Sequence, residues 1–189
     1  MSWGEVVKQI NDILDGVKDL LVNRYSVSNT PLYSLTTPLT YSDNDTNYKI
    51  ISDVFYPPKS GMYKIKMSFD ITLTSRTSNV VATGIINYVI KSLYKLRQSN
   101  SHVYESDFNT LFGKVGSTIT NLSLADLNLV ANSIQIQHTF KNYNDEYRET
   151  KEIVLLVYLE EKSPLTILAQ QQNSKYADIV TKINSVEIY

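Results

Sequence analysis

The stretch YPPKSGMYKIKMSFDITLT, residues 56–74, decides the fold of this chain. Two prolines and a glycine turn the chain sharply at its start, because proline fixes a backbone angle and glycine tolerates conformations that other residues avoid. Beyond the turn, apolar side chains alternate with polar ones at Tyr63, Ile65, Met67, Phe69, Ile71 and Leu73. A period of two is typical of a strand with one buried face. The stretch therefore predicts a turn that leads into a long, half-buried β-strand.

The rest of the chain contains further strand-like segments divided by polar turns. These segments are residues 48–56, 133–140, 151–159, 165–170 and 185–189. Residues 79–96 also fit helical spacing, but their many β-branched side chains favour a strand. Residues 107–132 are the least regular, and we interpret them as a long loop with a strand or a short helix. The pattern predicts a mainly β protein, an antiparallel jelly-roll sandwich with an N-terminal amphipathic helix.

Apolar residues recur in the first segment with the alternating spacing of three and four residues that marks a heptad seam. The seam consists of Trp3, Val6, Ile10, Ile13, Val17 and Leu20. Ser2 and Glu5 have the spacing of a capping box, which predicts that a helix begins there. So short a helix needs support from another copy, from its own domain or from a larger assembly. We therefore divide the chain into an anchoring or trimerising helix (1–24), a linker (25–47) and a jelly-roll head (48–189).

The composition excludes several functional classes. The 189 residues carry a net charge of −1 at pH 7, which provides no basic surface for nucleic acid or anionic lipid. Cysteine is absent, so disulfides, thiolate metal sites and cysteine nucleophiles are excluded. No apolar run has the roughly 18 residues of a membrane span, and the first residues lack the pattern of a secretory signal. We expect neither nucleic-acid binding nor membrane insertion.

Motifs for catalysis or cofactor binding are also missing from the sequence. The two histidines, His102 and His138, lie far apart in the chain and outside any metal-ligand pattern. Asp43, Asp45 and Asn47 begin like a calcium loop, but the glycine and the glutamate that complete such a loop are absent. No glycine-rich phosphate loop or serine-nucleophile motif occurs. We therefore predict a protein that is not an enzyme and that needs no metal or cofactor.

Tyrosine is the most unusual feature of the composition, with 14 residues against one tryptophan and five phenylalanines. A tyrosine ring can be buried while its hydroxyl forms a hydrogen bond, so the residue is common both in strands and at protein interfaces. Residues 141–149, KNYNDEYRE, are the best candidate for a hairpin tip that displays tyrosines. We expect Tyr143 and Tyr147 to form a partner-binding tip there.

The residues around the opening stretch resemble jelly rolls of the tumour-necrosis-factor-like superfamily, which includes the globular heads of the first complement component. The residues that carry the resemblance are Phe55, Pro57, Gly61 and Tyr63. Residues 152–169 and 183–189 also resemble the closing strands of those folds, although the usual Gly-Asp turn is replaced by residues 160–162. Residues 107–133 depart from the pattern, which leaves the strand order there open.

In that superfamily, three subunits pack their inner sheets around an axis, and the long strand and the terminal strand supply those sheets. The resemblance therefore implies a homotrimer whose interface includes Tyr63, Ile65, Met67, Val186, Ile188 and Tyr189, or their neighbours on the opposite face. Alternation alone does not say which face is core and which is interface. The chain is apolar to its last residue, so we expect that end to be buried in its own sheet or against other copies.

The first residues, MSWGEVVKQIND (1–12), resemble the start of structural proteins from phages of low-GC Gram-positive bacteria, in which a short helix anchors the protein to the virion. This resemblance implies a virion component that is assembled in the host cytoplasm and acts outside the cell. The leading hypothesis is a homotrimeric fibre, head-fibre or baseplate appendage. Its helix contacts other virion proteins, and its head binds a host-surface glycan or protein. The alternatives are a free-standing carbohydrate-binding module and a glycan-degrading enzyme on the same fold.

Overall fold

The computed structural model describes residues 2–25, 30–42, 45–93, 105–112, 114–119 and 127–189, with the backbone alone described for residues 16–25 and 105–107. The helices are α1 (Trp3–Tyr25) and α3 (Glu105–Phe112). The strands are β1 (Tyr33–Ser34), β2 (Leu39–Tyr41), β3 (Tyr48–Ile50), β4 (Gly61–Ser75), β5 (Val80–Ser92), β6 (Thr118–Ile119), β7 (Asn128–Phe140), β8 (Glu146–Leu159), β9 (Leu165–Gln171) and β10 (Ala177–Ile188). The protein is mainly β, as the sequence predicts.

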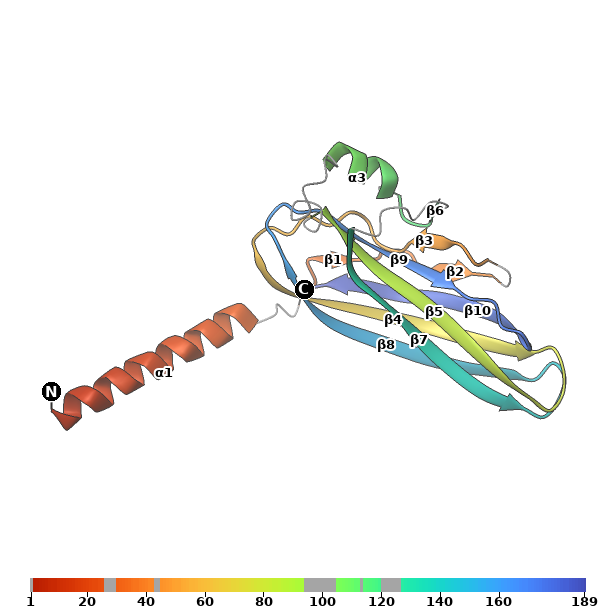
Figure 1. Cartoon of the computed structure of the whole chain (residues 1–189), viewed down its shortest axis with the longest axis horizontal. Coiled ribbons are helices and arrows are strands. Elements are labelled where there is room, and N and C mark those ends of the chain that lie inside the picture. Colours follow the sequence, from red (N-terminus) through yellow and green to blue (C-terminus); the bar gives the residue numbers. More distant parts are fainter. Residues whose placement is uncertain (1, 26–29, 43–44, 94–104, 113, 120–126) are drawn as a thin grey trace.

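The strands form two antiparallel sheets that pack face to face (Figure 1). Sheet A has the order β1-β10-β4-β8, and β2 also pairs with β10. Sheet B has the order β6-β3-β9-β5-β7. From β3 to β5, and again from β7 to β10, the chain changes sheet at each connection. This order is that of a jelly-roll sandwich, so the predicted fold class is confirmed.

Strand β4 supplies much of the core between the sheets. It pairs with β8 along its length, from Gly61 opposite Leu159 to Thr74 opposite Glu146. Its odd-numbered residues from Tyr63 to Leu73 are buried, while the even-numbered residues face outward. Burying one large aliphatic side chain stabilises a fold by roughly 1.5–3 kcal/mol, so the alternation that predicts the strand also explains its place at the centre of the sandwich.

The sharp turn before β4 is held from two sides. The ring of Phe55 meets the ring of Tyr63 edge-on with a centroid distance of 6.0 Å, and the Tyr63 hydroxyl donates to the Lys59 carbonyl at 2.7 Å. The Pro57 carbonyl accepts a hydrogen bond of 3.0 Å from the backbone of Lys162, in the turn between β8 and β9. Lys162 has a φ of 59°, a left-handed conformation that glycine adopts more easily. The missing Gly-Asp turn is thus a change of residue in a turn that is still formed.

The ambiguous segment after the β4–β5 turn is a strand from Val80 to Ser92, which confirms the β prediction there; residues 94–96 lie outside the described residues. The irregular middle segment contributes α3, β6 and the start of β7. Helix α3 packs over the outer face of sheet B and forms a second apolar cluster with it. The cluster consists of Ile50, Leu93, Phe108, Phe112, Leu127 and Leu168. Each sheet therefore has its inner face in the main core, and sheet B also has a covered outer face.

The N-terminal helix begins with the predicted capping box. The Ser2 backbone donates to Glu5 Oε2 at 2.6 Å, and the Glu5 backbone donates to Ser2 Oγ at 3.3 Å. The first of these bonds lowers the pKa of the Glu5 carboxyl. Helix α1 then extends away from the sandwich (Figure 1). None of the helices in the described part of the chain is both long and apolar enough to cross a membrane.

The predicted linker, residues 25–47, is only partly a linker. Both β1 and β2 lie within it and pair with β10, where Tyr33 is opposite Ile188 and Leu39 is opposite Ile183. The sequence indicates only short extended pieces there, because two or three residues are too few to show a period of two. The described head domain therefore begins before residue 48.

Candidate functional site

Helix α1 presents an unpartnered apolar stripe in the single chain. The exposed fraction is 83% for Trp3, 51% for Ile10 and 66% for Ile13, and Val7 and Leu14 are half exposed. Val6 is the one predicted seam residue among residues 2–15 that is partly covered. The side chains of Val17 and Leu20 lie outside the described residues. The apolar side chains of residues 3–14 are therefore not buried against the head, and so many of them at one spacing make the helix a candidate interaction surface.

A second exposed apolar surface lies on the outer face of sheet A. It consists of Met62, Val154, Leu156 and Tyr158, which we call the sheet A patch, and their exposed fractions run from 38% to 59%. Met62 is the direct cross-strand partner of Tyr158. Leu156 and Val154 are opposite Lys64 and Lys66, whose long side chains border the patch. The patch lies at the end of β8 that adjoins the start of β4, which is also the end from which α1 extends (Figure 1).

The structure corrects the residues predicted for the trimer interface. Tyr63, Ile65 and Met67, like Val186 and Ile188 on β10, point between the sheets and are at most 4% exposed. They form the core of one chain and are not available to a second copy. Their opposite-face neighbours, the alternative that the resemblance also allowed, face outward, because on β4 and β8 the even-numbered residues lie on the outer face.

Tyr189, the sixth predicted residue, does lie on the outer face beside the sheet A patch. The ammonium group of Lys64 lies 4.1 Å from the centre of its ring, and its hydroxyl donates to Glu187 at 2.9 Å, which raises the pKa of the tyrosine. Its backbone exchanges two hydrogen bonds with Lys64, of 2.9 and 3.1 Å. The apolar end of the chain is thus held in its own sheet, which was one of the two predicted outcomes.

The other half of the outer face of sheet A is charged. Asp70, Arg148 and Lys182 surround a shallow hollow of about 260 Å³ together with Thr40, Thr72 and Val180. Asp70 accepts a hydrogen bond of 2.6 Å from the Thr150 hydroxyl, and this bond, one from Asn184 and the nearby cations lower the pKa of its carboxyl. Arg148 binds Thr72 at 3.2 Å and Glu146 at 3.3 Å. These donors and cations favour the ionised form of the Asp70 carboxyl.

The predicted hairpin tip is present, but only one of its two tyrosines is displayed. Tyr143, in the turn between β7 and β8, is 70% exposed. Tyr147 instead stacks on the ring of His138 with a centroid distance of 4.0 Å, and its hydroxyl donates to Glu149 at 3.0 Å. Tyr176, in the turn between β9 and β10, is 37% exposed at the same end of the sandwich and was not predicted.

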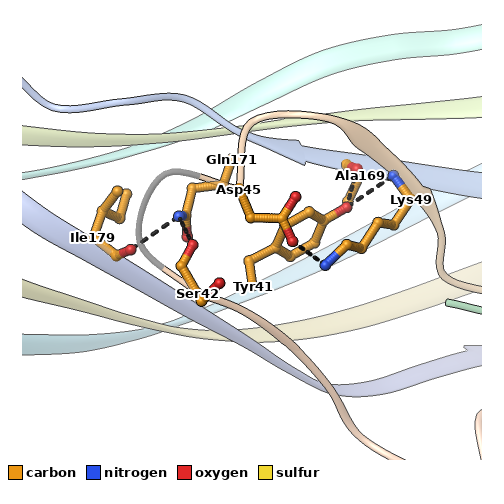
Figure 2. A network of polar contacts seen from close by, with 7 residues as sticks. All are labelled: Tyr41, Ser42, Asp45, Lys49, Ala169, Gln171 and Ile179. Carbon is orange, nitrogen blue, oxygen red and sulfur yellow. Dashed lines mark hydrogen bonds and ion pairs between the residues drawn. The ribbon is translucent and has the colours of Figure 1, made fainter. Parts of the chain in front are cut away.

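A buried polar network joins the segment around β2 to both sheets (Figure 2). The fully buried Tyr41 donates its hydroxyl to the Ala169 carbonyl and accepts a bond of 3.0 Å from the Lys49 backbone. Burial raises the pKa of this tyrosine strongly. The side chain of Lys49 forms an ion pair with Asp45 and lies 4.5 Å from the centre of the Tyr41 ring.

Gln171 completes this network by donating to the carbonyls of Ser42 at 3.0 Å and Ile179 at 2.9 Å. The network holds the start of the head in place and uses Asp45 for an ion pair. Asp43 lies outside the described residues, so the predicted absence of a calcium site in this loop stays a prediction. Within the described ranges, no three histidine, aspartate or glutamate side chains are grouped as a metal site requires.

Comparisons with known proteins add little. No protein-family model matches the chain, and no curated protein matches it. One of the solved structures that match is the Eiger TNF from S. frugiperda, with 6% sequence identity and a TM-score of 0.28 over 82% of this chain and 92% of that one. A likeness this weak carries no argument about function. The jelly-roll assignment rests on the strand order.

Proposed function

We propose that this protein is a non-enzymatic structural protein that assembles as a homotrimer, with α1 and the sheet A patch as its assembly surfaces and the jelly-roll head facing outward. The observation that carries the proposal is the pair of apolar surfaces, both exposed in the single chain and both at the same end of the head. In water such surfaces are unfavourable, and burial against copies of the same chain removes them together.

Neither surface is large enough to hold the assembly alone. A stable interface buries more than about 1,000 Å² with good complementarity, which four side chains cannot supply. A three-heptad helix is likewise marginal as an isolated coiled coil. Joined in one chain, each contact raises the effective concentration of the other, so the two together bind far more strongly than either does alone.

The surroundings of the sheet A patch suit contact between identical chains. Lys64 and Lys66 lie on the same outer face as Glu152 and Glu187, and Lys66 is the cross-strand neighbour of Glu187. A face that carries both signs of charge can pair with a rotated copy of itself without a net repulsion. We therefore assign the occupant of the face to a further copy of this chain.

We further propose that the trimer is a short fibre, head fibre or baseplate appendage of a phage virion, assembled in the host cytoplasm and active outside the cell. This part is supported by the likeness of residues 1–12 to the anchoring helices of phage structural proteins. In this arrangement α1 also contacts other virion proteins. Tail, portal or lysin genes beside the gene for this protein would support the assignment, and detection of the chain in purified particles by mass spectrometry would test it directly.

Assembly is tested by the mass of the full chain in solution. Light scattering after size-exclusion chromatography is expected to give three times the 21.5 kDa of one chain. Leu156→Glu is expected to lower this mass, because it places a charge in the sheet A patch. The matched control is Val81→Glu, on β5 of the other sheet, where Val81 is 47% exposed and the mass is expected to stay unchanged. A wild-type monomer at micromolar concentration would overturn the proposal and favour a free-standing carbohydrate-binding module.

A further inference from the structure

Three turns at the end of the head away from α1 are joined by backbone hydrogen bonds (Figure 1). They are residues 76–79 between β4 and β5, residues 141–145 between β7 and β8, and residues 172–176 between β9 and β10, and we call them the distal turns. The β4–β5 turn lies in the middle. On one side, Ser75 exchanges two bonds of 2.9 Å with Asn144 and Asp145. On the other side, the backbone of Arg76 donates to the Tyr176 carbonyl at 2.9 Å.

These bonds make the distal turns one preorganised surface. Arg76 also forms an ion pair with Asp178 across the same junction. Asn79 and Asn144 take left-handed conformations, with φ of 56° and 65°, which asparagine accepts more readily than most residues. A surface whose backbone is already fixed loses little conformational entropy when it binds a ligand, and this is a property of efficient binding sites.

The outer two distal turns have the same chemistry. Each displays a tyrosine, Tyr143 at 70% and Tyr176 at 37% exposure, on either side of the β4–β5 turn. Each also contains a lysine, Lys141 and Lys175. The ammonium group of Lys175 lies 4.9 Å from the centre of the Tyr176 ring. The core of the head does not need rings in these positions, because both lie outside the buried cluster.

Apart from the Arg76–Asp178 ion pair, the distal turns contain two lysines, Lys141 and Lys175, and one carboxylate, Asp145, so their net charge is positive. Asp145 accepts bonds of 3.2 and 3.1 Å from the backbone and side chain of Asn142, and Asp178 is paired with Arg76. A ligand would therefore meet tyrosine rings, amide groups and lysines. Ring faces stack on the apolar faces of sugar rings, while amides and lysines bind hydroxyl and acidic groups.

We infer that the distal turns form a carbohydrate-binding site whose ligand is a polysaccharide that carries acidic groups. A protein partner is less well matched, because a protein interface has a contiguous, fully buried apolar centre, whereas these rings are separated by a polar turn. The inference rests on the proposed function in one respect, since an outward-facing head places the distal turns at the exposed end. In a trimer, three such sites would bind a repeating polymer with increased avidity.

The test is binding of the full chain to an array of purified polysaccharides, some neutral and some bearing carboxylate or phosphate groups. The wild-type protein is expected to bind acidic members, and the double variant Tyr143→Ala/Tyr176→Ala is expected to lose roughly tenfold or more in affinity. The matched control is Tyr56→Ala, because Tyr56 is 38% exposed but lies outside the distal turns. Lys141→Gln/Lys175→Gln is expected to weaken binding to the acidic members and to reduce its dependence on salt.

Solution mass and melting temperature are measured for every variant, so that loss of binding is separated from loss of folding or assembly. Lost binding with unchanged mass and melting temperature supports the inference. Binding by the tyrosine double variant that equals wild type would overturn it, as would a wild-type protein that binds no polysaccharide or binds a protein array alone. A trimer that binds no polysaccharide overturns this inference and leaves the proposed assembly standing, whereas a monomer that binds through Tyr143 and Tyr176 does the reverse.

Discussion

The outer faces of the two sheets carry similar side chains but differ in what covers them. On sheet B, apolar residues such as Ile50 and Leu168 are buried under α3, whose Phe108 and Phe112 rings meet at 4.9 Å. On sheet A, Val154, Leu156 and Tyr158 remain about half exposed. Helix α3 therefore covers part of the outer face of sheet B within the chain. We propose that another copy of the chain covers the apolar part of the outer face of sheet A.

The largest expected effect is a loss of stability when the contact between α3 and the outer face of sheet B is weakened. Phe108→Ala should lower the free energy of unfolding by about 3–5 kcal/mol, because it leaves a cavity between α3 and sheet B. Urea unfolding measures the loss. Leu111→Ala on the same helix is the control, since Leu111 is 47% exposed, and it should change stability far less. Equal, small effects at both positions would show that α3 does not cover sheet B as described.

A substitution in the exposed stripe of α1 is expected to weaken the association of chains and not the stability of the head. Ile13→Ala should weaken assembly by about 1.5–3 kcal/mol, the contribution of one buried aliphatic side chain, and leave the stability of the single head unchanged. Sedimentation equilibrium measures the dissociation constant. Asn11→Ala changes an exposed residue outside the predicted seam and serves as the control. If Ile13→Ala lowers the melting temperature of the head and not the association, the helix packs on its own domain.

A smaller effect is expected at the start of α1. Ser2→Ala removes the bond from the Glu5 backbone to Ser2 Oγ and should destabilise the first turn by about 1 kcal/mol. Hydrogen exchange in the N-terminal peptide should become faster, while exchange in the core of the head should not change. Ser2→Asp should restore the slow exchange, because aspartate caps helices about as well as serine. Slow exchange in Ser2→Ala would show that contacts other than the cap hold this turn.

The smallest effect is expected in the charged half of the outer face of sheet A, where Asp70 and Arg148 form hydrogen bonds within the same chain. The folded pKa of Asp70 lies below its ordinary value of 3.8, so its contribution to stability is present above that pH and is lost as the pH falls through the folded pKa. Asp70→Asn should reduce stability at about pH 6 by less than about 1 kcal/mol, because the group is largely solvated, and should have a smaller effect at about pH 2, below the ordinary pKa of the group. Urea unfolding at both pH values measures this difference, and an equal loss at both would show that charge is not the cause.

Alternation predicted the long strands, but it could not say whether a given face forms the core or an interface between chains. In β4 the even-numbered residues are mostly polar, so the buried face is clear once the sheet is known. In β8 both faces are apolar near the end, with Ile153 and Val157 inside and Leu156 outside. An unbroken apolar run in an edge strand was the available signal that the outer face of β8 is also apolar, because alternation is typical of a strand with only one apolar face.

Of the two exposed tyrosines in the distal turns, the sequence predicted only Tyr143. Tyr143 follows from a local hairpin pattern that a sequence shows directly. Tyr176 lies in another turn and is brought near it only through the turn between β4 and β5. Proximity of this kind depends on the pairing of strands far apart in the chain. The same holds for β1, β2 and the Tyr41 network, whose partners on β9 and β10 lie more than a hundred residues away.

The pairing of β1 with the end of β10 also determines how the head would respond to mechanical force. Leu32 and Leu35 donate to the carbonyls of Ile188 and Val186 at 2.7 and 2.9 Å, next to the point where α1 joins the head. A pull between α1 and the distal turns would act along the strands and would draw β1 and β10 in opposite directions. All hydrogen bonds between the two strands would then be strained at once, in shear, where a sideways pull would break them one after another. If the protein is part of a fibre, a load along the fibre axis would act on the junction between α1 and the head in shear, the geometry in which the paired strands resist force best.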